Sequence, residues 1–268
     1  MNQVQIEVVS VPKDISNKPE QGPRPPRMIS PEFFSYTLSQ VSGLTHNVIL
    51  YGRGDPLLHP QFDDLMDACY TKDMKVHLVT DGLHMGEHRY LLNYPQLYEL
   101  TFDLTDIDQE RIDYKHHMDA ILGICETAAT LDYPLCTILF SGSNVNRKPA
   151  TRFLMTELGK HYHPEFVSEH EGFRICRHVF VRLLDDEVKT EPVTHGTCRH
   201  CAKTITILAN GIVTPCRQDR EGVISLGNIH MSSLNRILDS GRLKKMLVDF
   251  STNEIREPFC QNCRYRGK

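Results

Sequence analysis

The sequence lacks the features that direct a protein to a membrane or to nucleic acid. No stretch approaches the roughly 18 consecutive apolar residues of a membrane span, and residues 1–11 lack the basic and long apolar segments of a secretion signal. The formal net charge is -4, and the scattered basic residues form no stripe that would attract duplex nucleic acid or an anionic membrane. We therefore expect a soluble, cytoplasmic protein with neither kind of partner.

Cysteine is absent from residues 1–68, and its use elsewhere excludes a disulfide framework. The chain has nine cysteines, an odd number, and the cytosol keeps thiols reduced. Cys69, Cys125, Cys136 and Cys176 each stand alone among apolar or amphipathic residues, so we expect them to be small, buried apolar side chains. The other five cysteines crowd into residues 198–263.

The order of residue patterns predicts an α/β protein. Hydrophobic residues make up 40% of the chain, which is enough for one large α/β domain or for a domain with a small appendage. Over residues 1–184, short β-branched runs alternate with stretches of helical period, which is typical of β/α units and a parallel sheet; we predict six such units. Ser30-Pro31-Glu32 predicts a helix start, with an N-cap, a first-position proline and an acidic first turn. The last unit is predicted as a helix over 149–162 and a strand over 174–184.

The last third has a different character. Residues 185–197 are charged and turn-rich and predict a linker. Beyond the linker, Asn210-Gly211 lies between two short apolar runs, which is the pattern of a tight β-hairpin. Residues 233–248 have the period of an amphipathic helix.

The five clustered cysteines predict a metal site. A Cys-x-x-Cys pair aims two thiolates in one direction, and the chain has two such pairs, Cys198/Cys201 and Cys260/Cys263. The hairpin at Asn210-Gly211 is expected to bring Cys216 back near Cys201. Five cysteines thus compete for about four places at one site. Ligand count alone leaves both an iron–sulfur cluster and a zinc ion open.

This segment resembles the SPASM or twitch extension at the C-terminus of many radical S-adenosylmethionine (SAM) enzymes. The family pattern is Cys, nine to fifteen residues, Gly, four residues, Cys. Cys201, Gly211 and Cys216 fit it with nine and four intervening residues, and Cys198 fits it with twelve and four. Thr214-Pro215-Cys216, the run 226–229, Ser233-Leu234 and the final Cys-x-x-Cys follow in the family's order.

The resemblance implies one auxiliary [4Fe-4S] cluster, with zinc as the alternative. Because the sequence reaches Lys268 soon after its last cysteine, we expect one cluster at most. By analogy with the twitch form, the ligands would be Cys198, Cys216, Cys260 and Cys263, with Cys201 as a spare or substitute.

Residues 1–184 resemble the radical SAM partial barrel, a (β/α)6 TIM-like arrangement whose sites lie at the C-terminal ends of the strands. The segment 52–60 is similar to the family's Gly-Glu-Pro motif with Asp55 in place of glutamate, and segment 80–82 is similar to its Thr-Asn-Gly. The predicted fold is thus a partial (β/α)6 barrel over 1–184, a linker over 185–197 and a small α+β SPASM/twitch-like domain over 198–268. The residues that the resemblance assigns to cofactor binding are Gly52, Gly54, Asp55, Pro56, Thr80, Asp81 and Asp103. Each motif also has a structural explanation, as a flexible turn, a strand-ending turn or a loop cap.

The family's catalytic motif, Cys-x-x-x-Cys-x-x-Cys in the loop after the first strand, is missing. The corresponding loop, residues 12–19, contains no soft ligand. The resemblance therefore implies a degenerate member that has lost reductive SAM cleavage, and it leaves open whether SAM still binds.

Several hypotheses follow. The first is a non-catalytic iron–sulfur protein whose barrel mouth binds a peptide, nucleotide or protein partner and whose cluster serves structure or electron transfer. The second is an enzyme that still binds SAM or a nucleotide and performs altered chemistry. The third is a subunit of an active radical SAM enzyme, and the last is a zinc-binding interaction module. The histidines His116/His117 and His161/His163 are expected to be solvated.

Overall fold

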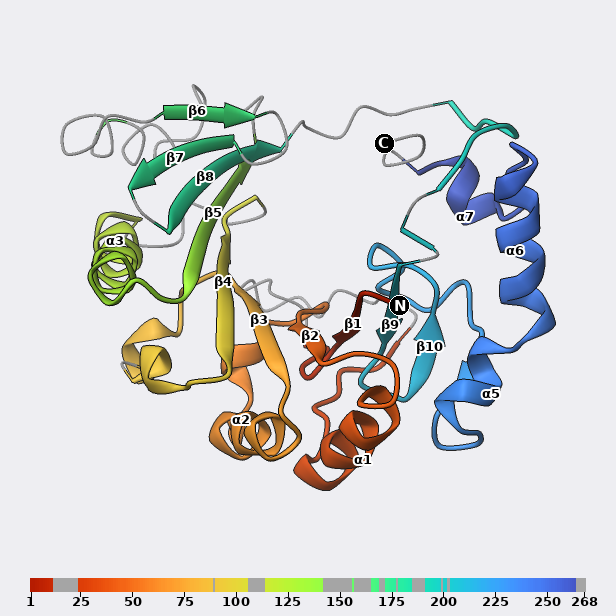
Figure 1. Ribbon diagram of the computed structural model, residues 1–268, viewed down its shortest axis with the longest axis horizontal. Helices are drawn as coiled ribbons and strands as arrows, with labels where there is room; N and C mark the ends of the chain where they lie inside the picture. The colour runs from red at the N-terminus through yellow and green to blue at the C-terminus, as the bar shows by residue number, and fades with distance from the viewer. Residues whose placement is uncertain are drawn as a thin grey trace. The chain divides into compact units, whose positions relative to one another are not determined.

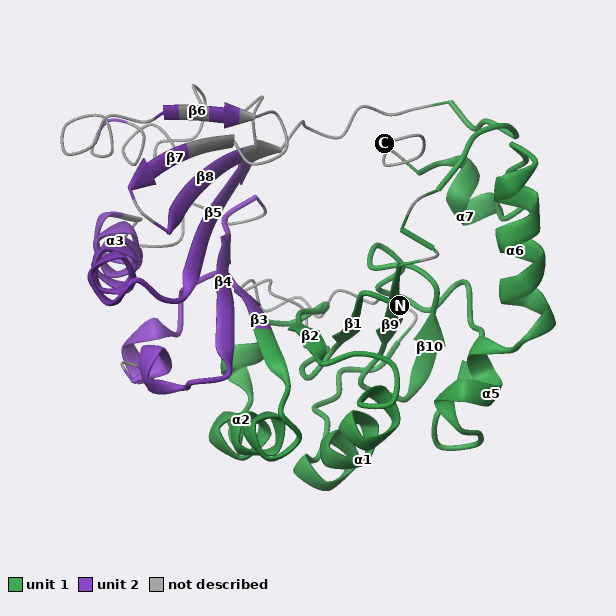
Figure 2. Ribbon diagram, viewed as in Figure 1, with its two compact units in different colours: residues 1–76, 188–268 green, residues 77–187 purple. Residues whose placement is uncertain are grey.

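The structure is a computed structural model. It describes residues 1–11, 24–88, 90–105, 114–141, 156, 165–168, 172–176, 178–184, 191–198, 200–201 and 203–263. The chain divides into two compact units, one of residues 1–76 and 188–268 and one of residues 77–187 (Figure 2). The domain boundaries predicted at 184 and 198 stay a prediction. Within the described ranges, no helix combines the length and apolarity needed to cross a membrane.

The first unit contains a sheet assembled from both ends of the chain (Figure 1). Its strands are β1 (Gln3–Ile6), β2 (Asn47–Leu50), β9 (Thr204–Ile207), β10 (Ile212–Thr214) and β11 (Gly227–Asn228). Its helices are α1 (Pro31–Val41), α2 (Phe62–Thr71), α5 (Leu234–Leu238), α6 (Gly241–Ser251) and α7 (Pro258–Gln261).

Strand β1 is an interior strand of this sheet, between β9 and β2. It pairs in parallel with β2, placing Val4 opposite Val48, and in parallel with β9, placing Val4 opposite Ile205. Val4 and Ile6 are fully buried, as expected for a parallel strand with neighbours on both edges. The cysteine-rich third of the chain therefore continues the sheet of the first strands.

The second unit contains the strands from the middle of the sequence. They are β3 (Lys75–Thr80), which begins at the boundary between units, β4 (Leu97–Asp103), β5 (Leu135–Ser141), β6 (Glu165–Ser168), β7 (Gly172–Cys176) and β8 (Val179–Leu184), with one long helix, α3 (Tyr114–Leu131). β4, β5 and β8 are parallel, whereas β6 and β7 run antiparallel at the edge.

Two predicted elements are wrong in a similar way, because each is divided in two. The strand predicted over 174–184 is the hairpin of β7 and β8, which turns at His178 with a φ of 65°. The helix predicted over 233–248 ends at Leu238, and α6 starts anew where the Ser240 hydroxyl accepts a hydrogen bond from the Leu243 N–H at 3.4 Å. The helix predicted over 149–162 lies outside the described residues, apart from residue 156.

Local signals elsewhere are confirmed. Ser30 caps α1, accepting a hydrogen bond from the Phe33 N–H at 3.2 Å, and Pro31 is the first residue of that helix. Gly211 has a φ of 82°, the left-handed conformation that the predicted hairpin between β9 and β10 requires.

Candidate metal centre

The five cysteines of the last third line one pocket. They come from segments that are far apart in the sequence: Cys198 and Cys201 precede β9, Cys216 follows β10, Cys260 lies in α7 and Cys263 follows it. The other lining residues are all apolar: Pro215, Met246, Phe250, Ile255 and Phe259. We call this site the cysteine pocket. It brings together the two Cys-x-x-Cys pairs and Cys216.

Backbone hydrogen bonds fix the segments that carry these thiols. The Cys263 N–H donates to the Cys260 carbonyl at 3.1 Å, which closes the turn between the second pair. The Cys216 carbonyl accepts from the hydroxyls of Thr206 and Thr214, at 3.3 and 3.1 Å. Cys216 is thus held against both strands of the hairpin.

The thiols are close enough to affect each other's ionisation. Burial raises the pKa of Cys201 to about 12, with further contributions from Cys198 and Cys216. Burial also raises the pKa of Cys216 to about 11, with contributions from Cys263 and Cys198. The pKa of Cys260 is raised by burial and by all four other thiols. A metal or cluster must therefore displace protons when it binds.

The donor set fits an iron–sulfur cluster. Thiolates are the usual ligands of such a cluster, and N–H groups that donate to the sulfurs help to set its reduction potential. The Gln218 N–H donates to the Cys216 Sγ at 3.4 Å. Among the residues that the structure describes, no three His, Cys, Asp or Glu side chains form a group that could hold a metal ion. The thiols therefore share one pocket and affect each other's pKa values, but in this structure they do not form a ready ligand group.

The 52–60 segment is explained by close packing. A Cβ on Gly52 would lie 2.4 Å from the Glu7 Cγ, and one on Gly54 would lie 2.5 Å from the Val11 carbonyl oxygen. Asp55 is 1% exposed, and its carboxylate accepts a hydrogen bond from the Leu57 N–H at 2.9 Å, which starts a short turn at Pro56. Gly52, Gly54 and Asp55 therefore each have a local structural role.

The polar strand ends of the second unit are also buried. Thr80 and Asp81 at the end of β3 are 0% and 4% exposed, and Asp103 at the end of β4 is 8% exposed. The Thr80 hydroxyl accepts from the Gly82 N–H and the Asp81 carboxylate from the Leu83 N–H, each at 3.0 Å. The Asp103 carboxylate accepts from the N–H and hydroxyl of Thr105, at 3.2 and 2.6 Å.

His117 was missed by the sequence reasoning, which expected it to be solvated. It is 6% exposed, whereas the adjacent His116 is exposed as predicted, and His161/His163 lie outside the described residues. Its Nε2–H donates to the Asp81 carbonyl at 2.8 Å, and its buried Nδ1 has no hydrogen bond. Burial lowers the pKa of His117, which favours the neutral ring.

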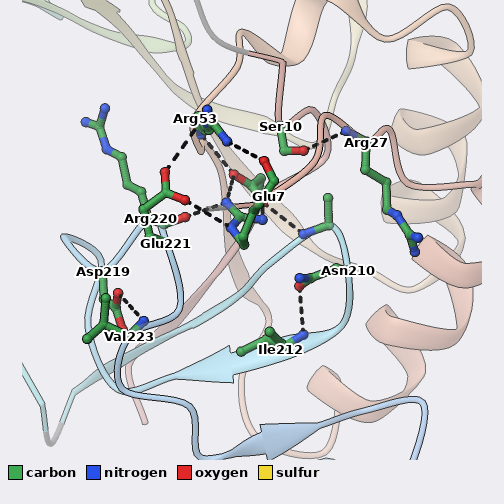
Figure 3. Close-up of polar contacts among 12 residues, drawn as sticks. Glu7, Ser10, Arg27, Arg53, Asn210, Ile212, Asp219, Arg220, Glu221 and Val223 are labelled. Carbon is green, nitrogen blue, oxygen red and sulfur yellow. Dashed lines mark hydrogen bonds and ion pairs between the residues drawn. The ribbon is translucent and has the colours of Figure 1, made fainter. Parts of the chain in front are cut away.

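A second group missed by the sequence reasoning lies just after β1. Glu7 is fully buried, and its carboxylate accepts hydrogen bonds from the Arg24 guanidinium at 2.9 and 3.0 Å. It also accepts from the N–H groups of Arg53 and Ala209, both at 3.0 Å. Arg220 and Glu221 approach from the segment after Cys216 (Figure 3). We call Glu7, Arg24, Arg53, Arg220 and Glu221 the charged junction. The only sequence signal was a glutamate inside an apolar run.

Comparison with known proteins places these features in a known fold. Residues 194–264 match the SPASM family model, described as an iron–sulfur cluster-binding domain. No curated protein matches the sequence significantly.

Three solved structures share the fold at low sequence identity. BtrN in complex with AdoMet and 2-DOIA is 12% identical, with a TM-score of 0.59, covering 94% of this chain and 87% of that one. anSMEcpe with bound AdoMet and Cp18Cys peptide is 11% identical, with a TM-score of 0.56, covering 98% of this chain and 86% of that one. Streptococcus suis SuiB bound to the precursor peptide SuiA is 11% identical, with a TM-score of 0.51, covering 97% of this chain and 69% of that one. The chain therefore has the radical SAM/SPASM fold, a partial α/β barrel whose C-terminal region matches an iron–sulfur cluster-binding domain.

Proposed function

We propose that this protein holds one auxiliary [4Fe-4S] cluster, has lost reductive SAM cleavage, and acts as a binding, scaffold or electron-transfer subunit for a peptide- or protein-modifying enzyme. The observation that carries the proposal is the contrast in thiol use. Five cysteines line one pocket within the region that matches the cluster-binding domain, and residues 1–68 contain none.

The ligands we propose are Cys198, Cys216, Cys260 and Cys263, with Cys201 as the spare. When bound, a [4Fe-4S] cluster supplies a one-electron carrier or a rigid cross-link between segments. The apolar walls of the pocket, including Met246 and Phe250, would limit the access of water. The N–H donated to Cys216 would stabilise the thiolate form of that ligand.

The loss of SAM cleavage is supported by the absence of cysteines from the segment that follows β1. Radical SAM enzymes place three cluster-ligating cysteines in that loop, whereas the first cysteine here is Cys69, a fully buried residue of α2. Burial raises the pKa of Cys69, so its thiol is protonated and unreactive. The described ends of the loop are held by the buried ion pair of Glu7 and Arg24.

A peptide or protein partner is supported by relatives of the same fold. SuiB was solved with its precursor peptide SuiA, and anSMEcpe with the Cp18Cys peptide. An active radical SAM enzyme is a natural candidate partner, because it would provide the catalytic cluster that this chain lacks. The composition favours neither a membrane nor a nucleic-acid partner.

The test is anaerobic purification followed by iron and sulfide analysis, Mössbauer spectroscopy and an assay for 5′-deoxyadenosine with SAM and dithionite. We expect about four irons and four sulfides per chain, and no 5′-deoxyadenosine. Zinc without acid-labile sulfide would instead establish the zinc-binding alternative. Formation of 5′-deoxyadenosine would refute the loss of SAM cleavage.

A second candidate function is an enzyme that retains SAM or nucleotide binding. The observation that favours it is the presence of buried carboxylates, Asp81 and Asp103, at the ends of adjacent β/α units. Calorimetry with SAM and S-adenosylhomocysteine tests it, and the absence of heat at millimolar ligand would reject it.

A further inference from the structure

The charged junction contains two buried cations, and the two carboxylates beside them differ in how completely they are hydrogen-bonded. Arg24 and Arg53 are 6% and 8% exposed. Glu7 is fully buried and accepts four hydrogen bonds, two of them from the Arg24 guanidinium. Glu7 therefore has the complete set of donors that a buried carboxylate requires.

Glu221 is held much more loosely. Its carboxylate lies 3.7 Å from the Arg24 Nε and 3.7 Å from the Arg53 Nε, beyond hydrogen-bond distance, and its side chain is 32% exposed. Its buried Oε2 and the buried Arg24 Nε both lack a hydrogen bond. Two groups that could satisfy each other thus face each other at ion-pair distance.

The charges show why an anion is needed at this position. Glu7 hydrogen-bonds to the Arg24 guanidinium, and Glu221 lies at ion-pair distance from the Nε of both Arg24 and Arg53 but leaves the Arg24 Nε without a hydrogen bond. A guanidinium group prefers a planar carboxylate in hydrogen-bond contact. A carboxylate of a separate ligand could move into hydrogen-bond contact with the Arg24 Nε, which the Glu221 side chain does not reach.

The backbone around Glu221 allows its side chain to move without unfolding the turn. The Asp219 carboxylate accepts a hydrogen bond from the Val223 N–H at 2.8 Å (Figure 3) and another from the Ile224 N–H at 2.7 Å. Arg220 is anchored separately, with its guanidinium above the Tyr51 ring at 4.9 Å. The main chain on both sides of Glu221 is thus fixed independently of its carboxylate.

We propose that Arg24 and Arg53 form a binding site for the carboxylate of a ligand, and that Glu221 is a tethered carboxylate that occupies the site until the ligand displaces it. The ligand carboxylate would bond to the Arg24 Nε and lie between the two guanidinium groups. This site is separate from the cysteine pocket and does not depend on the proposed cluster.

The experiment is calorimetry on the full, anaerobically purified chain at constant ionic strength. The probes are N-acetylglycine, which carries a main-chain carboxylate, the α-amide of N-acetylglutamate, which carries a side-chain carboxylate, and the uncharged N-acetylglycinamide. We expect Glu221→Gln to bind one or both carboxylate probes about tenfold more tightly than the unmodified protein, because a tethered competitor has been removed. The probe that binds more tightly identifies the source of the carboxylate.

Matched variants separate this site from a general charge effect. Glu254→Gln removes a carboxylate that pairs with Arg256 at 2.6 Å, and it should bind the probes as the unmodified protein does. Arg24→Gln added to Glu221→Gln should abolish binding. The proposal is overturned if Glu221→Gln, folded by circular dichroism, binds N-acetylglycinamide as well as the carboxylates or binds none of the three.

Discussion

The cysteine pocket and the charged junction belong to the same unit, but their buried polar groups have opposite surroundings. In the pocket, five thiols face apolar walls, and burial raises the pKa values of Cys201 and Cys216. In the junction, Glu7 is saturated with donors from the protein itself. Thus the thiols of the pocket need an added metal cation to ionise, whereas Glu7 in the junction is paired with a cation of the protein itself, the Arg24 guanidinium. Variants in each of the two regions test this difference.

The largest expected effect is the loss of the metal from the pocket in Cys260→Ala. We expect iron to fall from about four per chain to near zero, because the variant removes a proposed ligand whose pKa is affected by all four other thiols of the pocket. Iron and sulfide analysis of anaerobic protein measures it. Cys69→Ala, which removes a buried thiol of α2, should keep its iron.

The same measurement on Cys201→Ala decides which cysteine is the spare. Retention of iron supports the proposed ligand set. Loss of iron equal to that of Cys260→Ala would make Cys201 a ligand and contradict the choice made by analogy with the twitch form.

The next largest effect is expected in the junction. Glu7→Gln removes the charge that Arg24 faces in the interior, and we expect the free energy of unfolding to fall by about 3–5 kcal/mol. Chemical denaturation measures the change. Glu257→Gln breaks a more exposed ion pair with Arg242 and should cost at most about 1 kcal/mol. Equal effects of the two variants would show that the junction is as weak as a surface pair.

Gly52→Ala tests the packing of the junction without changing its charge. The new Cβ would lie 2.4 Å from the Glu7 Cγ, so Glu7 would have to shift away from its donors. We expect a loss of about 1–3 kcal/mol in the free energy of unfolding. Gly43→Ala is the control, because its new Cβ meets no atom within 4 Å. If Gly52→Ala lowers the free energy of unfolding no more than Gly43→Ala does, the close contact is contradicted.

The smallest effect is expected in the second unit, where His117 is a buried titratable group outside both regions. Burial lowers its pKa from the usual 6.5, so below that pH the unfolded chain binds a proton more readily than the folded chain does. The stability contributed by neutral His117 is fully present above about pH 6.5 and is lost as the pH falls through the lowered pKa. His117→Gln should therefore flatten the decline between pH 7.5 and 5 by about 1 kcal/mol.

Denaturation at each pH measures this slope, and His116→Gln is the adjacent, exposed control. A slope in His117→Gln that is as steep as in the unmodified protein would assign the acid sensitivity to other groups.

Local patterns predicted much of the fold. Ser30-Pro31-Glu32 predicted the start of α1, and Asn210-Gly211 predicted the hairpin of β9 and β10, because each signal lies within a few consecutive residues. The predictions failed where a single residue interrupts an apparently continuous pattern, as at His178 and Ser240. The Ser240 hydroxyl caps a new helix, and His178 adopts a positive φ that turns the chain between β7 and β8.

The candidate sites differ in the same respect. The cysteine pocket could be predicted because spacing within short motifs places the thiols. The junction could not, because the donors to Glu7 lie 17, 46 and 202 residues away, and no local pattern relates them. His117 was misjudged because its neighbour at Asp81 is 36 residues away.

The parallel pairing of β1 with β9 also constrains how the chain is made. Gln3 pairs with Thr204. The edge of β1 that pairs with β9 therefore has no strand to bond to until about three quarters of the chain has been synthesised. Residues 77–187 form their own compact unit and are complete before that partner exists. Contacts of such long sequence separation slow folding, and exposed strand edges attract other chains. The protein should therefore depend on chaperones during synthesis more than its size suggests.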